Sequence, residues 1–210
     1  MKIVREAYLV VLLSLTGLCF SLYAIRFSKL SYILVFLFLT TLVFSLYFFR
    51  DPKRNIQFSE DEIASPADGT IISISNENFS DILVVRIFLS VFDVHLQRTP
   101  INGKVKDITF TPGKFHIAYK PQAKDNQRNI IKIEGENNKW AWVEQITGAI
   151  ARRIVSYVKV GDYVKTGDKI GMIYFGSQVA LYLPKDVELK VSVGDKVKAG
   201  ETLLGLWKKN

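Results

Sequence analysis

The residues with the clearest chemical potential in this chain are Gly176 and Ser177, which follow one another between two apolar, strand-like runs. The preceding run reads IGMIYF and the following run reads QVALYLP. A Gly-Ser pair in this setting can be a self-cleavage site, because glycine has no Cβ and tolerates the strained backbone that an acyl shift from nitrogen to oxygen requires. A simple turn is the other interpretation of the pair. The serine of a hydrolase is a poorer match, because its Gly-x-Ser-x-Gly pattern would need glycine where Val179 stands.

Three further side chains could take part in chemistry. His95 lies in the segment FDVHLQRTP and could carry a proton near neutral pH, although a single histidine is also often structural. Asp68 lies in SPADGTI, where aspartate before glycine is also a common turn device. Arg98 stays protonated, so it cannot be a general base, but it could bind a carboxylate or phosphate or form a surface salt bridge. We treat His116 as structural.

Composition excludes several classes of function. The two histidines are far apart and the one cysteine, Cys19, lies in an apolar run, so we expect neither a metal site nor a disulfide framework. The formal charge is +8, but seven basic and only two acidic side chains precede residue 55. The positive charge is therefore concentrated beside apolar runs, which argues against a nucleic-acid-binding groove.

Two uncharged runs, residues 7–25 and 30–49, are each close to the length that a membrane-spanning helix needs. The four-residue connector between them allows only an antiparallel hairpin, so residues 1–54 are predicted to form a membrane anchor. A signal peptide and a buried helical core are the alternatives. Basic residues at both ends of the hairpin favour termini, and a following domain, on the cytoplasmic side of the cell membrane, and they would attract anionic lipid.

Residues 55–210 are predicted to form a mainly β domain, a sandwich or a barrel, because many short β-rich runs alternate with Gly, Pro, Asn and Asp. Residues 143–155 are ambiguous between strand and short helix. The candidate strands are 69–75, 82–89, 104–110, 129–134, 140–146, 154–160, 169–174, 179–183 and 188–193.

An internal repeat refines this prediction. Residues 158–168 read VKVGDYVKTGD and residues 191–201 read VSVGDKVKAGE, with seven of eleven positions identical. The pattern resembles the half-motif of lipoyl and biotinyl carrier domains, which fold as a barrel-sandwich hybrid and carry a modified lysine at a hairpin tip. Here the corresponding place between the repeats holds Ser177. A non-enzymatic, membrane-anchored carrier or adaptor remains an alternative, although Lys185 lacks the expected flanking residues.

Several segments, in this order, resemble the phosphatidylserine decarboxylase family, specifically its short membrane-anchored branch. They are FRDP at 49–52, PADG at 66–69, DVHLQRTP at 93–100, PGKF at 112–115, NQRN at 126–129 and FGS at 175–177. The resemblance implies a proenzyme that decarboxylates phosphatidylserine to phosphatidylethanolamine with a covalent pyruvoyl group made from Ser177.

The resemblance also implies the chemistry of the site. Ser177 would attack the carbonyl of Gly176, and the chain would split into a β chain of residues 1–176 and an associated α chain of residues 177–210. The pyruvoyl group would form a Schiff base with the substrate amine and act as electron sink. His95 would be the proton donor, and Asp68 would orient a base or help to activate the serine. Arg98, where longer members carry a second histidine, would contact substrate.

Three questions stay open at this level. The lipid could be a related serine lipid such as archaetidylserine, because the head-group chemistry is the same. The chain could be a degenerate member that no longer cleaves, although its Gly-Ser pair is intact. The pair of fragments could also assemble into a higher oligomer.

Overall fold

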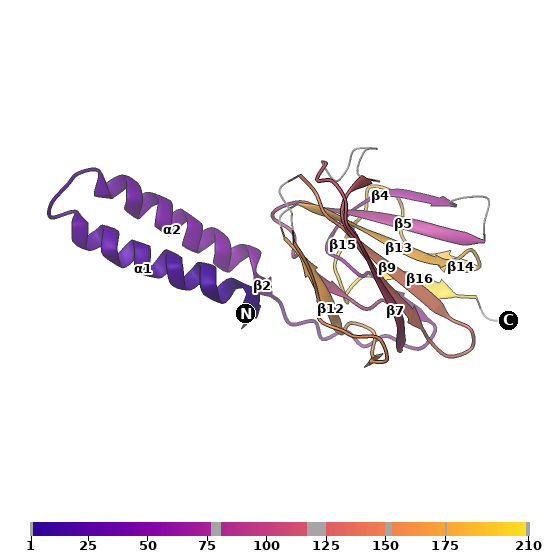
Figure 1. Cartoon of the computed structure of the whole chain (residues 1–210). Coiled ribbons are helices and arrows are strands. Elements are labelled where there is room, and N and C mark those ends of the chain that lie inside the picture. Colours follow the sequence, from indigo (N-terminus) through magenta and orange to yellow (C-terminus); the bar gives the residue numbers. More distant parts are fainter. Residues whose placement is uncertain (1, 77–80, 117–124, 150–152, 175, 209–210) are drawn as a thin grey trace. The chain divides into compact units, whose positions relative to one another are not determined.

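The computed structural model describes residues 2–76, 81–116, 125–149, 153–174 and 176–208 (Figure 1). The chain divides into two compact units, Met1–Lys53 and Arg54–Asn210. Phe175, the first residue of the predicted cleavage motif, lies outside the described residues.

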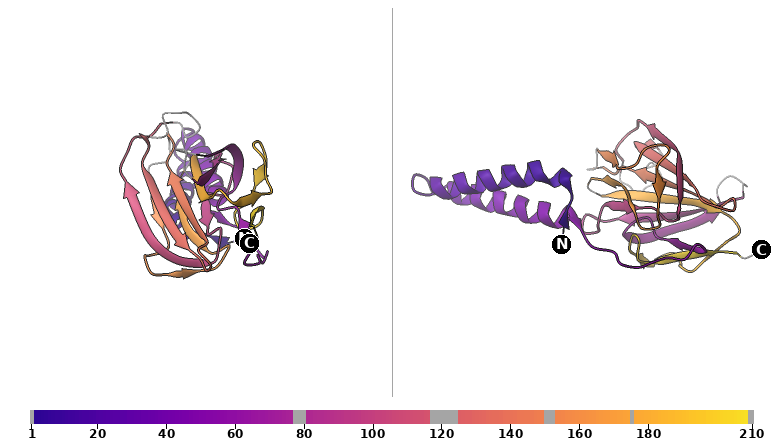
Figure 2. Two further views of the ribbon diagram at one scale, coloured as in Figure 1. Left: turned by 90° about the vertical axis from the view of Figure 1, so that its right-hand side faces the viewer. Right: turned by 90° about the horizontal axis from the view of Figure 1, so that it is seen from below.

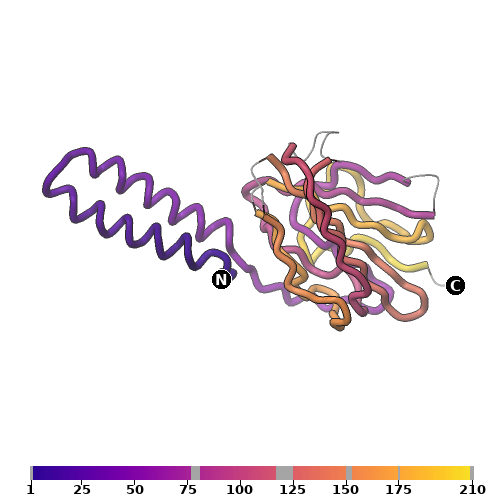
Figure 3. The backbone as a smooth tube through the Cα atoms, in the orientation of Figure 1, coloured from indigo at the N-terminus to yellow at the C-terminus, as the bar shows by residue number. Residues whose placement is uncertain are grey.

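The first unit is a helical hairpin. A 3-10 turn (η1, Arg5–Ala7) leads into α1 (Tyr8–Ala24), which packs against α2 (Ser31–Phe48) (Figure 3). The short strands β1 (Lys2–Ile3) and β2 (Arg50–Asp51) pair antiparallel at the base of the hairpin. Both helices are long and apolar enough to cross a membrane, and only 17% of each apolar window is buried within the protein. The hairpin therefore exposes apolar side chains in nearly every direction, as an environment of lipid tails would favour.

The second unit is mainly β, as the sequence predicted. Its strands are β3 (Glu62–Ala64), β4 (Gly69–Asn76), β5 (Ile82–Leu89), β6 (Leu96–Arg98), β7 (Gly103–Thr111), β8 (Arg128–Glu134), β9 (Trp140–Ile146), β10 (Ile154–Ser156), β11 (Tyr163–Val164), β12 (Lys169–Ile173), β13 (Ser177–Pro184), β14 (Val187–Leu189), β15 (Lys196–Val197) and β16 (Leu203–Trp207).

An eight-stranded sheet, in the order β11-β7-β8-β9-β13-β5-β4-β15, forms the body of this unit. It curls, as the turned views of Figure 2 show, and two three-stranded sheets, β10-β12-β6 and β14-β16-β3, complete the fold. Alternating apolar residues of these sheets meet in one buried core that includes Val85, Val143, Ile170, Leu181 and Leu204. Period-two alternation thus directs one face of each strand toward this core.

Strand β13 begins at Ser177, the serine of the predicted cleavage site. It pairs antiparallel with β5 on one side, from Ser177 opposite Leu89, and with β9 on the other, from Gln178 opposite Ile146. The carrier analogy predicted the serine at a hairpin tip, and this placement is wrong. Strand β12 pairs with β6 and β10, so the strands before and after the Gly-Ser pair lie in different sheets.

The repeat found in the sequence has a structural meaning. Strand β11 in the first copy and β15 in the second copy form the two opposite edges of the eight-stranded sheet. Strand β11 pairs with the start of β7 at Gly103, and β15 pairs with the start of β4 at Gly69. Glycines at 161 and 194, with φ of 99° and 97°, supply the left-handed turn in each copy.

The segments that receive these edges are also related, although the sequence resemblance is short. Residues 65–69 read SPADG and residues 99–103 read TPING. Asp68 Oδ1 accepts a hydrogen bond from Ala199 N at 2.8 Å. At the matching place Asn102 Oδ1 accepts one from Thr166 N at 2.8 Å. Asp68 is therefore the structural counterpart of a neutral turn-binding residue, with a negative charge added.

The remaining strand predictions agree with the structure to within a few residues. The ambiguous segment 143–155 contains the end of β9 and the start of β10, with residues 150–152 outside the described part, so it is strand wherever it is regular. The predicted strands 154–160 and 188–193 are shorter in the structure, because each runs into a repeat turn that begins near Val158 or Val191.

Candidate functional site

The structure brings His95 to the predicted cleavage site. The ring Nε2 accepts a hydrogen bond from the backbone N–H of Gly176 at 3.1 Å, and Nδ1 lies 3.0 Å from the carbonyl oxygen of Asp93. Because a backbone N–H can only donate, Nε2 is the unprotonated nitrogen and Nδ1 carries the proton that it donates to Asp93. His95 is completely buried. Its ring therefore accepts a hydrogen bond inside the protein from Gly176, the residue that precedes the predicted cleavage point.

The backbone of His95 is tied to the same stretch of chain. Its carbonyl oxygen accepts a hydrogen bond from Ile173 N at 3.2 Å and a second from Gln97 Nε2 at 2.8 Å. Ile173 is the last residue of β12, three positions before Gly176. Both ends of the histidine residue are therefore held against the segment that leads into the Gly-Ser pair.

Ser177 is buried and chemically available. Its exposed fraction is 0%, and its Oγ is one of the few buried side-chain oxygens in the described part of the chain that have no hydrogen-bond partner. A buried hydroxyl without a partner costs free energy, so an unpartnered one points to a use outside folding. The carbonyl that this hydroxyl would have to attack is that of the preceding residue, Gly176.

Gly176 has the conformation that favours glycine. Its φ is +60°, in the left-handed region, and a Cβ built there would meet nothing closer than Val91 Cγ1 at 3.9 Å. The need for glycine at this position is therefore backbone conformation rather than lack of space.

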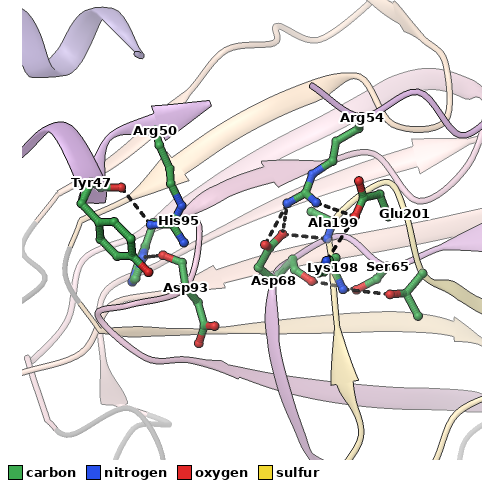
Figure 4. Close-up of polar contacts among 12 residues, drawn as sticks. Tyr47, Arg50, Arg54, Ser65, Asp68, Asp93, His95, Lys198, Ala199 and Glu201 are labelled. Carbon is green, nitrogen blue, oxygen red and sulfur yellow. Dashed lines mark hydrogen bonds and ion pairs between the residues drawn. The ribbon is translucent and has the colours of Figure 1, made fainter. Parts of the chain in front are cut away.

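Asp68 lies in a buried ion cluster. Arg54 Nη2 donates to both of its carboxylate oxygens, at 3.0 and 2.8 Å, and Arg54 Nη1 lies 2.6 Å from Glu201 Oε2 (Figure 4). Burial raises the pKa of the Asp68 carboxyl above its usual 3.8, while the Arg54 charge and the Ala199 N–H oppose that rise and the Asp93 charge adds to it. The carboxylate is thus turned toward Arg54 and the 198–201 turn.

Arg98 is mostly buried, and its Nη1 donates to the carbonyl oxygen of Gly167 at 2.7 Å. Its backbone N–H donates to Pro66 O at 2.9 Å. The side chain also lines an open surface cavity of about 450 Å³ together with Asp162, Asp168 and Lys169 among others. The contact with Gly167 gives Arg98 a bracing role at the first repeat turn, whereas its contact with substrate remains a prediction.

Arg54 contacts the candidate residue Asp68, and Gln97 contacts the candidate residue His95, although the sequence did not single out either of them. Arg54 was counted only as part of the basic end of the hairpin, and no local signal distinguishes it there. Gln97 lies between the candidate residues His95 and Arg98. The signal that could have found it is a polar residue two positions after the histidine, which in a strand lies on the same face. Among the described residues there is no group of three or more metal-ligating side chains.

Comparisons with known proteins show the family of the chain. A family model described as phosphatidylserine decarboxylase matches residues 42–205. Curated proteins named phosphatidylserine decarboxylase proenzyme are similar over most of the chain. The one from Desulfotalea psychrophila is 47% identical over 75% of this chain and 76% of its own, and that from Carboxydothermus hydrogenoformans is 45% identical over the same shares. The one from Geotalea uraniireducens is 43% identical, again over 75% and 76%.

The match includes both the histidine segment and the Gly-Ser pair, which the fold places in hydrogen-bonding contact. The chain therefore belongs to the phosphatidylserine decarboxylase family.

Proposed function

We propose that this protein is a self-processing decarboxylase that converts phosphatidylserine to phosphatidylethanolamine and carbon dioxide, in phospholipid biosynthesis. The observation that carries the proposal is the pairing of a buried, unpartnered Ser177 hydroxyl with a left-handed Gly176 whose N–H is held by His95. Ser177 is the only serine in the sequence that stands beside a glycine.

Self-cleavage would proceed by an acyl shift, an elimination and a hydrolysis. Ser177 Oγ attacks the carbonyl carbon of Gly176, its proton passes to the leaving nitrogen of Ser177, and an ester replaces the peptide bond. Loss of the α-proton of residue 177 then breaks the Cβ–Oγ bond, which leaves Gly176 as a free carboxylate and residue 177 as a dehydroalanine. Water then hydrolyses the dehydroalanine, whose nitrogen leaves as ammonia, and a pyruvoyl group remains at the start of the small fragment.

His95 has the position to serve both stages. Before cleavage its Nε2 lone pair holds the Gly176 N–H and fixes the strained peptide. After cleavage Gly176 is a chain end, and its departure would free Nε2 inside the site. The neutral ring, kept in the Nδ1–H form by Asp93, can then hold and return the proton that replaces the lost carboxylate.

The residues fit a pyruvoyl group. It would occupy the place of Ser177 at the start of β13, held by the strands β5 and β9 on either side, in a buried position where the serine hydroxyl has no partner. When formed, the group supplies an electron sink for the carbanion left by decarboxylation of an α-amino acid.

For Asp68, the contacts support an indirect part in cleavage. Its carboxylate holds the 198–201 turn, which belongs to the fragment that starts at Ser177. We propose that Asp68 acts by fixing this fragment around the cleavage site. Arg98 would contact the substrate carboxylate or phosphate from the edge of its surface cavity.

The hairpin would hold the catalytic unit at the cytoplasmic face of the cell membrane, where the head group of a lipid is within reach. The two helices are apolar enough for this role, and basic residues occur at the base and at the connector. The barrel-sandwich assignment remains part of the proposal. It is supported by the two repeat strands β11 and β15, which form the opposite edges of the eight-stranded sheet.

The test is decarboxylation of phosphatidylserine in mixed micelles by purified protein, with Ser177→Ala as control. We expect carbon dioxide release from the wild type in proportion to its cleaved fraction, and none from the variant. Equal release by uncleaved Ser177→Ala protein would refute the proposal. Release from archaetidylserine at a higher kcat/KM would move the substrate to that related lipid.

A further inference from the structure

Three buried amide side chains connect the interior of the large sheet to His95. Asn129 Nδ2 donates to Gln145 Oε1 at 2.9 Å, and Gln145 Nε2 donates to Gln97 Oε1 at 2.8 Å. Gln97 Nε2 then donates to the carbonyl oxygen of His95 at 2.8 Å. We propose that this amide relay, defined as Asn129, Gln145 and Gln97, positions His95 for self-cleavage and turnover.

The relay crosses between two sheets. Asn129 on β8 and Gln145 on β9 are direct cross-strand partners in the eight-stranded sheet, whereas Gln97 lies on β6 of a three-stranded sheet. The exposed fractions of the three residues are 4%, 0% and 0%. A polar group in such a place is retained only where its hydrogen bonds are complete, because an unmade one costs free energy.

The direction of the relay follows from its end. The carbonyl of His95 can only accept, so Gln97 must present its NH₂ group to it and its oxygen to Gln145. The oxygen of Gln97 in turn requires the NH₂ group of Gln145, whose own oxygen requires Asn129. Each amide thereby fixes the orientation of the next, and His95 receives a donor of fixed position.

The backbone around the relay leaves space for it. A Cβ on Gly171, in β12, would lie 2.6 Å from Gln145 Nε2 and 2.5 Å from the carbonyl oxygen of Val155. Glycine at this position therefore admits the Gln145 amide between the two sheets. The neighbouring end of β12 supplies the second donor to His95, Ile173 N.

This inference rests on the proposed role of His95, and its consequence is geometric. The relay and Ile173 N together occupy both lone pairs of the His95 carbonyl, which fixes the backbone from which the ring reaches Gly176. Loss of the Gln97 donor would let the residue rotate and would weaken the contact between Nε2 and Gly176 N–H.

The first experiment compares Gln97→Met, Gln145→Met and Asn129→Leu with the wild type for rate of self-cleavage in the full chain. We expect Gln97→Met to slow cleavage by at least about tenfold, the effect of one buried hydrogen bond on a barrier, with smaller effects at Gln145 and the smallest at Asn129. In the cleaved enzymes kcat should fall in the same order, with KM nearly unchanged. Val143→Ala, on the same face of β9, is the matched control for a destabilised core.

The second readout is independent of activity. The chain has only two histidines, so ¹⁵N-histidine spectra of uncleaved Ser177→Ala protein in detergent report the tautomer of His95 directly. We expect the Nδ1–H form in Ser177→Ala and in its Val143→Ala double variant, and a mixture of tautomers when Gln97→Met is added.

An unchanged tautomer together with wild-type cleavage in Gln97→Met would overturn the relay. Equal slowing by Val143→Ala at equal loss of stability would also overturn it. If His95→Ala itself cleaved and turned over normally, the proposed role of His95 would fail, and the tautomer spectra would still decide whether the amides position the ring.

Discussion

Replacing Arg54 by methionine should destabilise the catalytic unit strongly, because it leaves the Asp68 carboxylate buried without its cation. The side chains of Arg54 and Asp68 are 7% and 11% exposed, and the guanidinium makes two contacts with Asp68 and one with Glu201. Breaking a buried pair by removal of one partner costs about 3–5 kcal/mol. The Ala199 N–H still donates to Asp68, and Glu201 is partly exposed, so we place the loss near the lower end, about 3 kcal/mol.

The assay is urea unfolding of full-length Ser177→Ala protein in detergent, followed by tryptophan fluorescence. This background keeps the chain in one piece, so dissociation of two fragments does not contribute to the transition. With a slope of about 2 kcal/mol per molar urea, a loss of about 3 kcal/mol lowers the midpoint by about 1.5 M. Lys106→Met, which removes a surface ion pair with Glu134, is the matched control and should leave the midpoint unchanged.

Two further measurements separate this cause from a general loss of packing. The double variant Arg54→Met with Asp68→Asn should recover much of the loss, because Asn keeps the acceptor for Ala199 N and removes the lone charge, as Asn102 does in the other half of the fold. A midpoint for Arg54→Met within 0.3 M of the parent, about 0.6 kcal/mol, would refute the reasoning. So would a double variant less stable than Arg54→Met alone.

Four other predictions follow from the geometry. The raised pKa of Asp68 means that the folded carboxyl keeps a proton that the unfolded one has released. The free energy of unfolding should therefore fall as the pH rises from about 4 through the folded pKa. Urea titrations at several pH values measure this slope, and Asp68→Asn should remove it. Gly176→Ala should slow cleavage through backbone strain of about 1 kcal/mol without a steric clash, and normal cleavage kinetics on gels would contradict this. His95→Ala should leave most of the chain uncleaved. Any cleaved fraction, isolated by its pyruvoyl-blocked fragment, should have a kcat reduced at least about a hundredfold, a loss typical of a general acid. Wild-type turnover by this fraction would show that His95 is not the proton donor. Arg98→Met should raise KM for phosphatidylserine if Arg98 contacts the head group, and an unchanged KM with a lower urea midpoint would leave only its bond to Gly167.

The alternation of apolar residues predicted most of the strands, because that pattern depends only on neighbours along the chain. Strands 82–89 and 140–146 have the bounds expected from it. The alternation does not predict the order of the strands in the sheets or the position of Ser177. A serine between two apolar runs looks the same at a hairpin tip as at the entry to an inner strand, and only the pairing of β13 with β5 and β9 distinguishes them.

The family motifs indicated candidate site residues, whereas the partners of these residues depend on contacts between distant parts of the sequence. His95 and Gly176 are 81 positions apart, and Arg54 and Asp68 are 14 apart. The repeat was visible from residues 158–168 and 191–201, whereas its two receiving segments share only a proline, a glycine and similar polar residues between them. That short pattern acquires meaning only when Asp68 and Asn102 are seen to bind equivalent turns.

Intact mass spectrometry of the purified wild-type protein tests the central claim most directly. We predict two fragments, residues 1–176 ending in a normal carboxylate and residues 177–210 beginning with a pyruvoyl group, so that the small fragment resists Edman degradation. The two should elute together from a sizing column, because β13 of the small fragment lies between β5 and β9 of the large one. A single full-length mass with an unmodified serine, in protein that decarboxylates phosphatidylserine, would contradict the account.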